Sequence, residues 1–199
     1  FIFTSVNFFH KISNFYFYTP WIGMNNINFT GTYVAPATIY KNKEPIKAAI
    51  VRIDKSDLDS LAKVVDRWDT DLSDKIVNNL YYKELPNYKK IFAISTQRGG
   101  YQNLDDTKVQ GLFQVVDDKS KYTLQYLEVN PEHQHSARQS NPNKLSDIGK
   151  ACINFIKSTF AKEKETDLYA LEEAKPFYEK IGCKKDLNYS RGDRYIIEP

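Results

Sequence analysis

The chain has 199 residues, with 28 lysines and arginines against 25 aspartates and glutamates, so its formal net charge is +3. Hydrophobic residues make up 41% and charged residues 27%, which excludes a mainly disordered or collagen-like chain. This length favours a single domain that can bury a core without disulfides or a structural metal. The small net charge does not indicate a nucleic-acid or membrane partner, so we expect neither.

The first residues, 1–23, are rich in aromatic side chains but also contain polar ones such as Lys11. The stretch is too interrupted to cross a bilayer, and it lacks the charged start and small-residue cleavage site of a signal peptide. We therefore expect the functional chain to start at or near Met24, with 1–44 as an amino-terminal extension and 45–199 as the domain. The alternative is that 1–23 form an aromatic arm packed on the domain or on a partner. Without a targeting segment, the cytoplasm is the expected location.

From residue 45 onward, apolar residues recur in patterns of strand length and of helix length. A strand is predicted at 45–54, followed by a helix that Ser56 caps, with Asp59 three residues later completing a capping box. The buried stripe of this helix runs from Leu58 to Trp68. The remaining predicted elements, in chain order, are a helix at 72–82, strands at 90–96, 109–116 and 122–129, a helix at 148–159, a strand at 167–171, a helix at 173–181 and a strand at 194–198.

The order of these elements predicts a mixed α/β fold with one central sheet. Strands 90–96, 109–116 and 122–129 follow one another over polar links, so they should pair antiparallel. The polar stretch 130–143 is predicted to be a loop. A strand, a helix and a further strand, from 122–129 to 167–171, imply a parallel crossover.

Three parts of the chain carry recognisable motifs. Residues 109–113 (VQGLF) form an apolar strand with a central glycine, and residues 174–182 (AKPFYEKIG) follow a strand and form a helix. Between them, 127–131 (LEVNP) end a strand and 147–151 (DIGKA) begin a helix. Together these stretches, within about 45–198, resemble the GNAT superfamily of acyl-CoA-dependent N-acetyltransferases. The most specific is 174–182, which is very similar to the family's A-x-x-[FL]-Y-E-K-x-G signature.

The resemblance implies a GNAT-like sheet whose fourth and fifth strands splay apart and leave a slot. Backbone groups of Leu127 and Val129, at the end of the fourth strand, would bind the pantetheine arm of acetyl-CoA as an added strand would. One of their N–H groups would also polarise the thioester carbonyl. The helix that starts near Ile148 would direct its free N–H groups and its positive dipole end at the pyrophosphate, and Gly149 would allow close approach of the backbone.

The loop before this helix departs from the family's [QR]-x-x-G-x-[GA] pattern. It reads KLSDIG at 144–149, so Lys144 stands where Gln or Arg is usual, and Asp147 replaces the first glycine. The Asp147 carboxylate would repel a pyrophosphate, whereas Lys144 and Lys150 would offset that charge. Alternatively, Ser146 or Asp147 serves only to cap the helix.

By the resemblance, the chain would transfer an acetyl group from acetyl-CoA, its cosubstrate, to a primary amine by direct attack. Tyr178 matches the family tyrosine that protonates the departing thiolate, and a phenol pKa of about 10 in model peptides suits that role. The alternative for Tyr178 is a structural role in packing. The candidates for the general base are Glu128 and an ordered water.

A different class of function stays open, namely a catalytically inactive GNAT-fold module that binds or regulates. The unusual loop with Asp147 favours that alternative, whereas Tyr178 and the intact motif at 174–182 favour an enzyme. The acceptor is open between a small amine, a peptide amino terminus and a protein lysine. A homodimer is also open.

The cysteines and histidines indicate neither a disulfide framework nor a metal site. Cys152 falls on the apolar stripe of a predicted helix and Cys183 opens a strand-like run, so both are predicted to be small buried hydrophobic residues. Glu132, His133 and His135 lie close together in a polar loop, but no fourth ligand follows at metal-site spacing. We therefore expect no metal.

Overall fold

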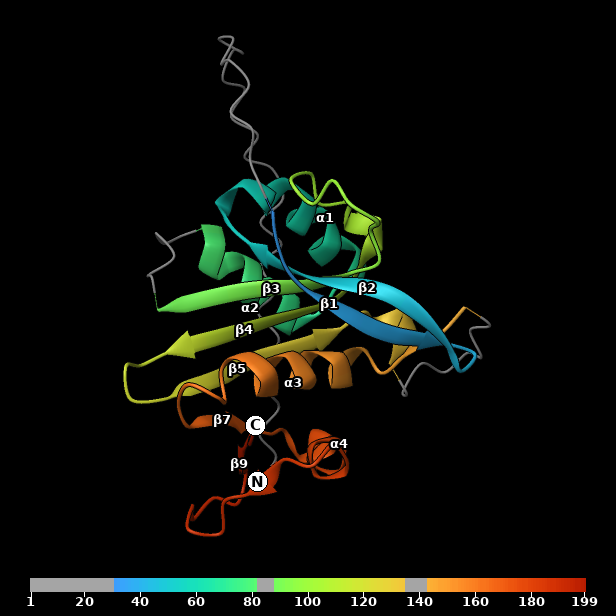
Figure 1. Ribbon diagram of the computed structural model, residues 1–199. Coiled ribbons are helices and arrows are strands. Elements are labelled where there is room, and N and C mark those ends of the chain that lie inside the picture. Colours follow the sequence, from blue (N-terminus) through green and yellow to red (C-terminus); the bar gives the residue numbers. More distant parts are fainter. Residues whose placement is uncertain (1–30, 82–87, 135–142) are drawn as a thin grey trace, which may run out of the picture.

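The computed structural model describes residues 31–81, 88–134 and 143–199. The predicted start near Met24 and the segment 1–23 lie outside these ranges. The described strands are β1 (Thr32–Lys41), β2 (Glu44–Ile53), β3 (Lys89–Ser95), β4 (Val109–Asp117), β5 (Tyr122–Val129), β6 (Leu145–Ser146), β7 (Thr166–Tyr169), β8 (Lys184–Lys185) and β9 (Arg194–Ile196). The described α-helices are α1 (Leu58–Trp68), α2 (Asp71–Tyr81), α3 (Ile148–Thr159) and α4 (Lys175–Lys180), as Figure 1 shows.

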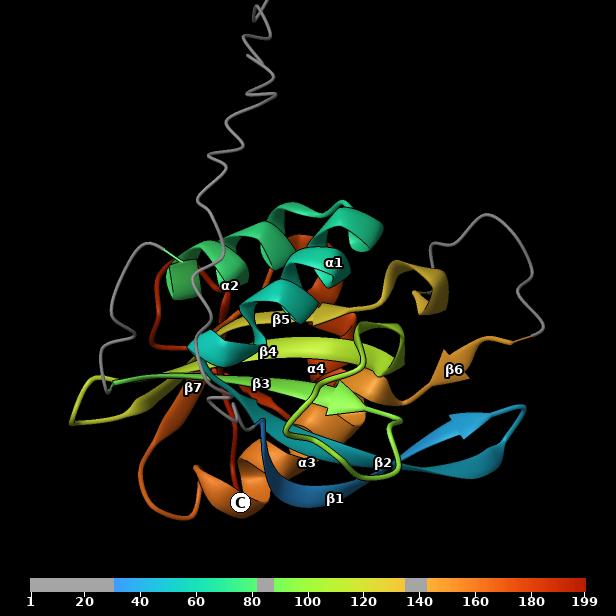
Figure 2. The same ribbon diagram turned by 90° about the horizontal axis from the view of Figure 1, so that it is seen from above.

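The described strands form one sheet, in the order β6-β1-β2-β3-β4-β5-β7-β9-β8. Every neighbouring pair is antiparallel except β5 and β7, which run parallel. Helices α1 and α2 cover one face of the sheet, and α3 covers the other (Figure 2). The predicted mixed α/β class and the predicted parallel crossover are confirmed.

The sheet begins earlier in the chain than the sequence predicted. β1 pairs with β2 through a tight turn in which Asn42 and Lys43 both have positive φ, 52° and 69°. This strand escaped prediction because Pro36 and several small or polar residues interrupt its pattern, and Ile39 is its only buried residue. The expected extension 1–44 therefore contains a strand of the sheet, and the short strand β6 pairs with the end of that strand.

The start of α1 differs from the predicted capping box. The N-cap residue of α1, Asp57, forms no side-chain capping hydrogen bond with that helix. Asp54, and not Ser56, caps the 3-10 turn ahead of α1 by accepting a hydrogen bond from the Ser56 N–H at 2.9 Å. In return Asp57, and not Asp59, accepts one from the Asp54 N–H at 3.2 Å. The cap lies upstream of the predicted one because a short 3-10 turn at Lys55–Asp57 precedes the helix.

Each face of the sheet carries its own hydrophobic core. On the face that α1 and α2 cover, here called the α1/α2 face, the predicted helical stripe buries Leu61, Val64 and Trp68. On the opposite face, here called the α3 face, Cys152 and Cys183 are buried, which confirms their predicted role as small hydrophobic residues. The side chain of a strand residue therefore packs against α1 and α2 if it lies on one face of the sheet, and against α3 if it lies on the other.

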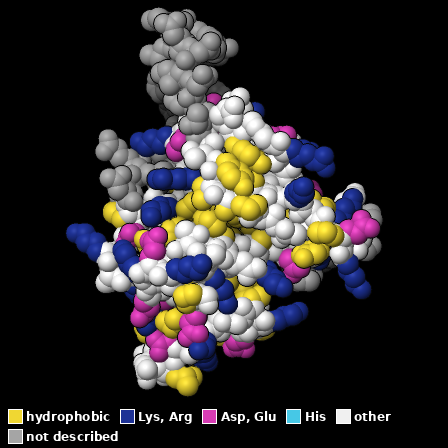
Figure 3. All heavy atoms as spheres, in the orientation of Figure 1, with side chains coloured by type: hydrophobic (Ala, Val, Ile, Leu, Met, Phe, Trp, Pro, Cys, Tyr) yellow, Lys and Arg dark blue, Asp and Glu magenta, His cyan; other side chains and the backbone are white. Residues whose placement is uncertain are grey.

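No helix within the described ranges is long and apolar enough to cross a membrane. On the side of the molecule in Figure 3, lysine and arginine side chains lie among acidic ones and do not gather in one patch.

Candidate functional site

β5 and β7 separate soon after they meet. They pair only where residues 122–124 lie opposite residues 166–168, whereas β5 continues to Val129. Beyond Leu124, β5 has no strand partner on its β7 side within the described ranges. The sheet therefore opens here, as the resemblance implied for the fourth and fifth strands.

The open edge of β5 presents the backbone of Leu127 and Val129. The Asn130 N–H donates to the Gln110 carbonyl at 3.0 Å, so these two residues form a hydrogen-bonded pair between β5 and β4. Bonded and non-bonded pairs alternate along an antiparallel ladder, so the backbone groups of Leu127 and Val129 point away from β4, into the opening. The Val129 carbonyl accepts a hydrogen bond from Gln134 Nε2 at 2.9 Å. That amide must move before a ligand can take its place.

The first turn of α3 lies on the sheet beside this opening. A Cβ on Gly111 of β4 would lie 3.0 Å from Ile148 Cγ2 and 3.4 Å from the Glu128 carbonyl. The absent side chain of Gly111 therefore sets how closely the start of α3 approaches the strands. Because Gly111 pairs with Val129, the helix begins next to the outward-facing backbone.

Asp147 occupies the N-cap position of α3 with a φ of 61°, in the left-handed region that glycine favours. Its carboxylate makes no capping hydrogen bond, and Ser146 belongs to β6, so neither forms the predicted alternative cap. The N–H groups of the first turn, from Ile148 onward, have no partner inside the helix. The backbone thus has the conformation expected of the family's glycine, although the side chain adds a negative charge.

Three further residues that the sequence singled out lie near this turn. A Cβ on Gly149 would lie 2.9 Å from Phe177 Cζ, so an aromatic ring of α4 fills the space beside this glycine. Lys144 Nζ donates to the Gln134 carbonyl at 2.9 Å, which ties it to the loop after β5. Lys150 is exposed on the first turn of α3.

Tyr178 packs from α4 against the core of the α3 face. Its ring centroid lies 5.1 Å from that of Phe177 and 6.2 Å from that of Tyr195. Its hydroxyl has no hydrogen-bond partner in the part of the chain that the structure describes. Burial, followed by the nearby Cys152 and Cys183, raises the pKa of Tyr178 well above its usual value. The phenol is therefore protonated at neutral pH.

Glu128 lies on the other face of the sheet. It pairs with Leu112, whose side chain belongs to the core under α1 and α2, and directly opposed residues share a face. The carboxylate is buried and accepts a hydrogen bond from Gln134 Nε2 at 2.7 Å. Burial raises the pKa of Glu128, and the bond from Gln134 partly opposes that shift. The two candidate catalytic side chains, Glu128 and Tyr178, thus lie on opposite faces of the sheet.

His133, which the sequence analysis considered only as a metal ligand, holds the loop after β5 together with polar partners that the sequence did not indicate. His133 Nε2 lies 3.0 Å from the Oε1 atom of the buried Gln110, and the Leu145 N–H donates to His133 Nδ1 at 3.4 Å. These two bonds require a neutral imidazole with its proton on Nε2. Burial lowers the pKa of His133, which favours the neutral ring. Single polar residues in a loop carry no periodic signal, so only the fold reveals these partners. His135 lies outside the described residues.

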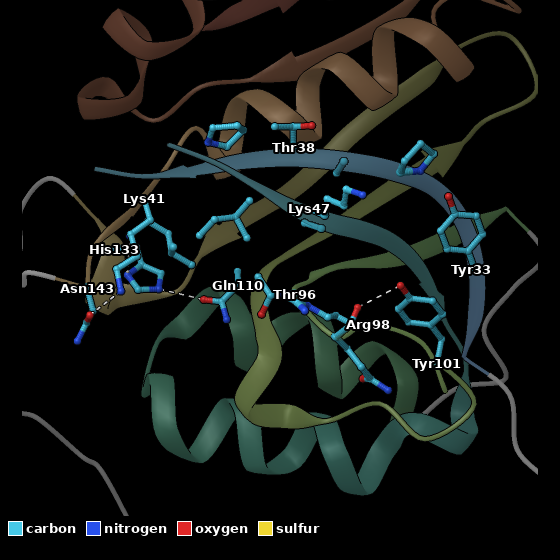
Figure 4. Close-up of a pocket in the computed structure, with 17 residues that line it drawn as sticks. Tyr33, Thr38, Lys41, Lys47, Thr96, Arg98, Tyr101, Gln110, His133 and Asn143 are labelled. Carbon is cyan, nitrogen blue, oxygen red and sulfur yellow. Dashed lines mark hydrogen bonds between the residues drawn. The ribbon is translucent and has the colours of Figure 1, made fainter. Parts of the chain in front are cut away.

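A cleft of about 1240 Å³ opens beyond the end of β3, between the β1–β2 hairpin and the loop after β3 (Figure 4). None of the predicted site residues lines it. Gln110, whose carbonyl accepts the hydrogen bond from Asn130 at the end of β5, is among the residues that line it. The lining side chains include those of Tyr33, Lys41, Lys47, Arg98, Gln110 and His133.

The sequence matches no protein-family model and no curated protein. Among solved structures, the ribosomal-protein-S18-alanine N-acetyltransferase from Escherichia coli is 15% identical, with a TM-score of 0.47 over 76% of this chain and 95% of that one. The PaiA N-acetyltransferase from Thermoplasma acidophilum, in complex with coenzyme A, is 17% identical, with a TM-score of 0.47 over 75% of this chain and 96% of that one. Tetrahymena GCN5 is 13% identical, with a TM-score of 0.48 over 83% of this chain and 98% of that one.

The likeness to these solved structures is one of fold.

Proposed function

We propose that this protein is an N-acetyltransferase that transfers the acetyl group of acetyl-CoA to a primary amine. The observation that carries the proposal is the open edge of β5, where the backbone of Leu127 and Val129 faces away from β4 beside the start of α3. An extended chain with amide groups, such as pantetheine, can pair with this edge as an added strand would.

The start of α3 supports binding of the pyrophosphate. Its first-turn N–H groups and its positive dipole end suit an anion, and the helix is long enough to have a substantial dipole. Lys150 on that turn, and Lys144 just before it, supply positive charge that offsets the Asp147 carboxylate. Gly149 contributes its backbone N–H, while the space next to its Cα is filled by Phe177.

The reaction begins when a neutral amine attacks the carbonyl carbon of the thioester. A C–N bond forms and the oxygen gains negative charge, which an outward-facing N–H of Leu127 or Val129 stabilises. The C–S bond then breaks and yields the amide and the CoA thiolate. The amine nitrogen loses one proton and the thiolate gains one, so the site needs both a base and an acid.

Tyr178 and Glu128 suit these two tasks. A phenol is protonated at neutral pH, and the Tyr178 hydroxyl lacks a partner among the described residues, so it is free to donate to a thiolate on the α3 face, although burial raises its pKa and makes it a weaker acid. Burial also raises the pKa of Glu128, which makes its carboxylate a stronger base toward an amine that arrives on the α1/α2 face. An ordered water beside Glu128 would serve the same purpose.

A catalytically inactive GNAT-fold module is the second candidate, and two observations favour it. Asp147 places a carboxylate at the start of α3, and Gln134 already occupies the Val129 carbonyl. Such a module would keep the fold and would show no turnover with any amine.

Release of the CoA thiol, followed with a thiol-reactive dye over a panel of primary amines, tests the proposal. We expect release that depends on the amine and that falls by about 100-fold in Glu128→Gln, the usual loss on removal of a general base. The raised pKa of Glu128 places the acidic limb of the wild-type pH profile above the ordinary glutamate range, and the variant should lack that limb. Bound acetyl-CoA without amine-dependent release would favour the inactive module.

A further inference from the structure

The cleft between the β1–β2 hairpin and the loop after β3 is lined by cations that lack counter-ions. Lys41, Lys47 and Arg98 line it, and its lining includes no aspartate or glutamate. Lys41 Nζ donates to the neutral amide oxygen of Asn143 at 2.7 Å, while Lys47 and Arg98 form no ion pair with any described residue. The stretches outside the described ranges contain a single acidic residue, Glu84. Among the described residues, no carboxylate is therefore paired with Lys47 or Arg98.

The cleft also borders an unpaired strand edge. β2 pairs with β3 only over residues 49–53, so its first half has no partner on that side within the described ranges. A two-residue turn joins β1 to β2, so the pair of Lys41 and Glu44 next to it is hydrogen-bonded. Bonded and non-bonded pairs alternate from there, so the N–H and C=O of Lys47 point away from β1 and toward the cleft. Pro45 has no N–H, so this edge is short.

We propose that this cleft binds an extended acidic peptide segment that carries the accepting amine, an inference that rests on the proposed function. The carboxylates of the segment would meet Lys47 and Arg98, and its main chain would pair with the backbone of Lys47. Apolar side chains between the acidic ones would lie against Tyr33 and Tyr101, whose ring centroids are 5.6 Å apart at the other end of the cleft (Figure 4). A volume of about 1240 Å³ exceeds that of most small-molecule pockets, about 300–1,000 Å³, which favours a peptide over a small amine.

The cleft leads toward the face of the sheet on which Glu128 lies. Gln110 lines the cleft and lies two residues before Leu112 on β4, and the Leu112 side chain belongs to the core of the α1/α2 face. Glu128 pairs with Leu112 and shares that face. A peptide in the cleft therefore directs its amine along β4 toward the Glu128 carboxylate.

Binding is measured first without acetyl-CoA, by fluorescence anisotropy of a dye-labelled short peptide of alternating glutamate and valine, with the full chain. The same peptide with glutamine in place of glutamate is the control. We expect the acidic peptide to bind more tightly, and its affinity to fall as salt is added. The double variant Lys47→Glu with Arg98→Glu should weaken binding by about tenfold or more, because two favourable charge pairs become repulsive.

The matched control is the double variant Lys63→Glu with Lys162→Glu, at exposed positions outside the cleft. It has the same net charge as the cleft variant and should keep the wild-type affinity. Thermal unfolding of both variants should match that of the wild type, because none of the four substituted residues has an ion-pair partner among the described residues.

Equal affinity for the acidic and neutral peptides, or unchanged affinity in the cleft variant, would overturn the proposal. Inorganic polyphosphate that binds through Lys47 and Arg98 when the acidic peptide does not would overturn it in favour of a phosphate ligand.

Acetyl transfer is then assayed with the same peptides carrying a free amino terminus. Transfer to simple amines but not preferentially to the acidic peptide would overturn this inference and leave the acetyltransferase proposal standing. Peptide binding without any transfer would overturn the assignment of the acidic peptide as the acceptor.

Discussion

Ile148 lies directly on Gly111, with its Cγ2 atom 3.0 Å from the position where a side chain at residue 111 would begin. The contact places the start of α3 above the pair that Gly111 forms with Val129. It thereby joins the two features on which the proposed cofactor site depends, the first turn of α3 and the open edge of β5.

A methyl group at Gly111 should push α3 away from the sheet. We expect Gly111→Ala to lower the free energy of unfolding by about 1–3 kcal/mol, the usual cost of overpacking, and to weaken the binding of acetyl-CoA. Urea unfolding measures the first effect and calorimetry the second. Ile148→Ala removes the Cγ2 atom, so the double variant should be less destabilised than the sum of the two single variants. If the losses in unfolding free energy of the two single variants simply add in the double variant, the contact between Ile148 and residue 111 is not what destabilises Gly111→Ala.

Removing the charge of Asp147 should strengthen the binding of acetyl-CoA. Asn also tolerates the left-handed backbone at this position, so Asp147→Asn changes the charge and keeps the turn. We expect affinity to rise by about threefold, since charges at a helix end contribute about 0.3–1 kcal/mol, and the gain should shrink at high salt. Calorimetric titration at two salt concentrations checks this. The same affinity in both proteins at low salt would place the phosphates away from Asp147.

Tyr178 should be needed for turnover and not for stability. Its hydroxyl has no hydrogen-bond partner among the described residues, so Tyr178→Phe should leave unfolding and acetyl-CoA affinity unchanged while kcat falls by about 100-fold. Tyr195 is the matched control, because its hydroxyl donates to Glu179 at 2.8 Å. Tyr195→Phe should lower the free energy of unfolding by about 1 kcal/mol and spare the chemical step. Full turnover in Tyr178→Phe would assign this tyrosine to packing.

The free energy of unfolding should fall as the pH rises through the range in which Asp57 titrates. Burial is the main cause that raises the pKa of Asp57 to about 6, whereas the carboxyl group of an unfolded chain titrates near pH ~3.9. The folded state therefore holds the proton more tightly, and its stability falls by about 2 kcal/mol as the pH rises from about 4 to about 6. Urea unfolding across this range should show the slope in the wild type and in Asp59→Asn, and a flatter profile in Asp57→Asn. An equal slope in all three proteins would contradict the assignment.

The parts of the fold that the sequence predicted are those that bury regular stripes. α1 and α3 place apolar residues at helical spacing, whereas β3 and β4 are continuous runs buried on both faces, and the predicted positions of these elements and of β5 are confirmed to within a residue or two. β1 lacks such a stripe, because it packs only lightly against its core. The predicted cap at Ser56 was wrong because a short 3-10 turn, capped by Asp54, precedes α1, and the residue types do not reveal that turn.

The candidate site was predicted only where a motif fixed the backbone. The positions of Leu127 and Val129 followed from the resemblance, and the ladder of β4 and β5 explains the direction of their backbone groups. Gln134 and the cleft were missed because they depend on residues that meet only in the folded chain. Lys47 and Arg98, for example, come from β2 and from the loop after β3.

Calorimetric titration of acetyl-CoA into the full chain tests the central claim most directly. We predict saturable binding in the micromolar range, weaker in Gly111→Ala and stronger in Asp147→Asn, because both residues lie where the start of α3 meets the end of β5. The absence of binding in the folded wild type and in folded Asp147→Asn would contradict a cofactor site at this junction.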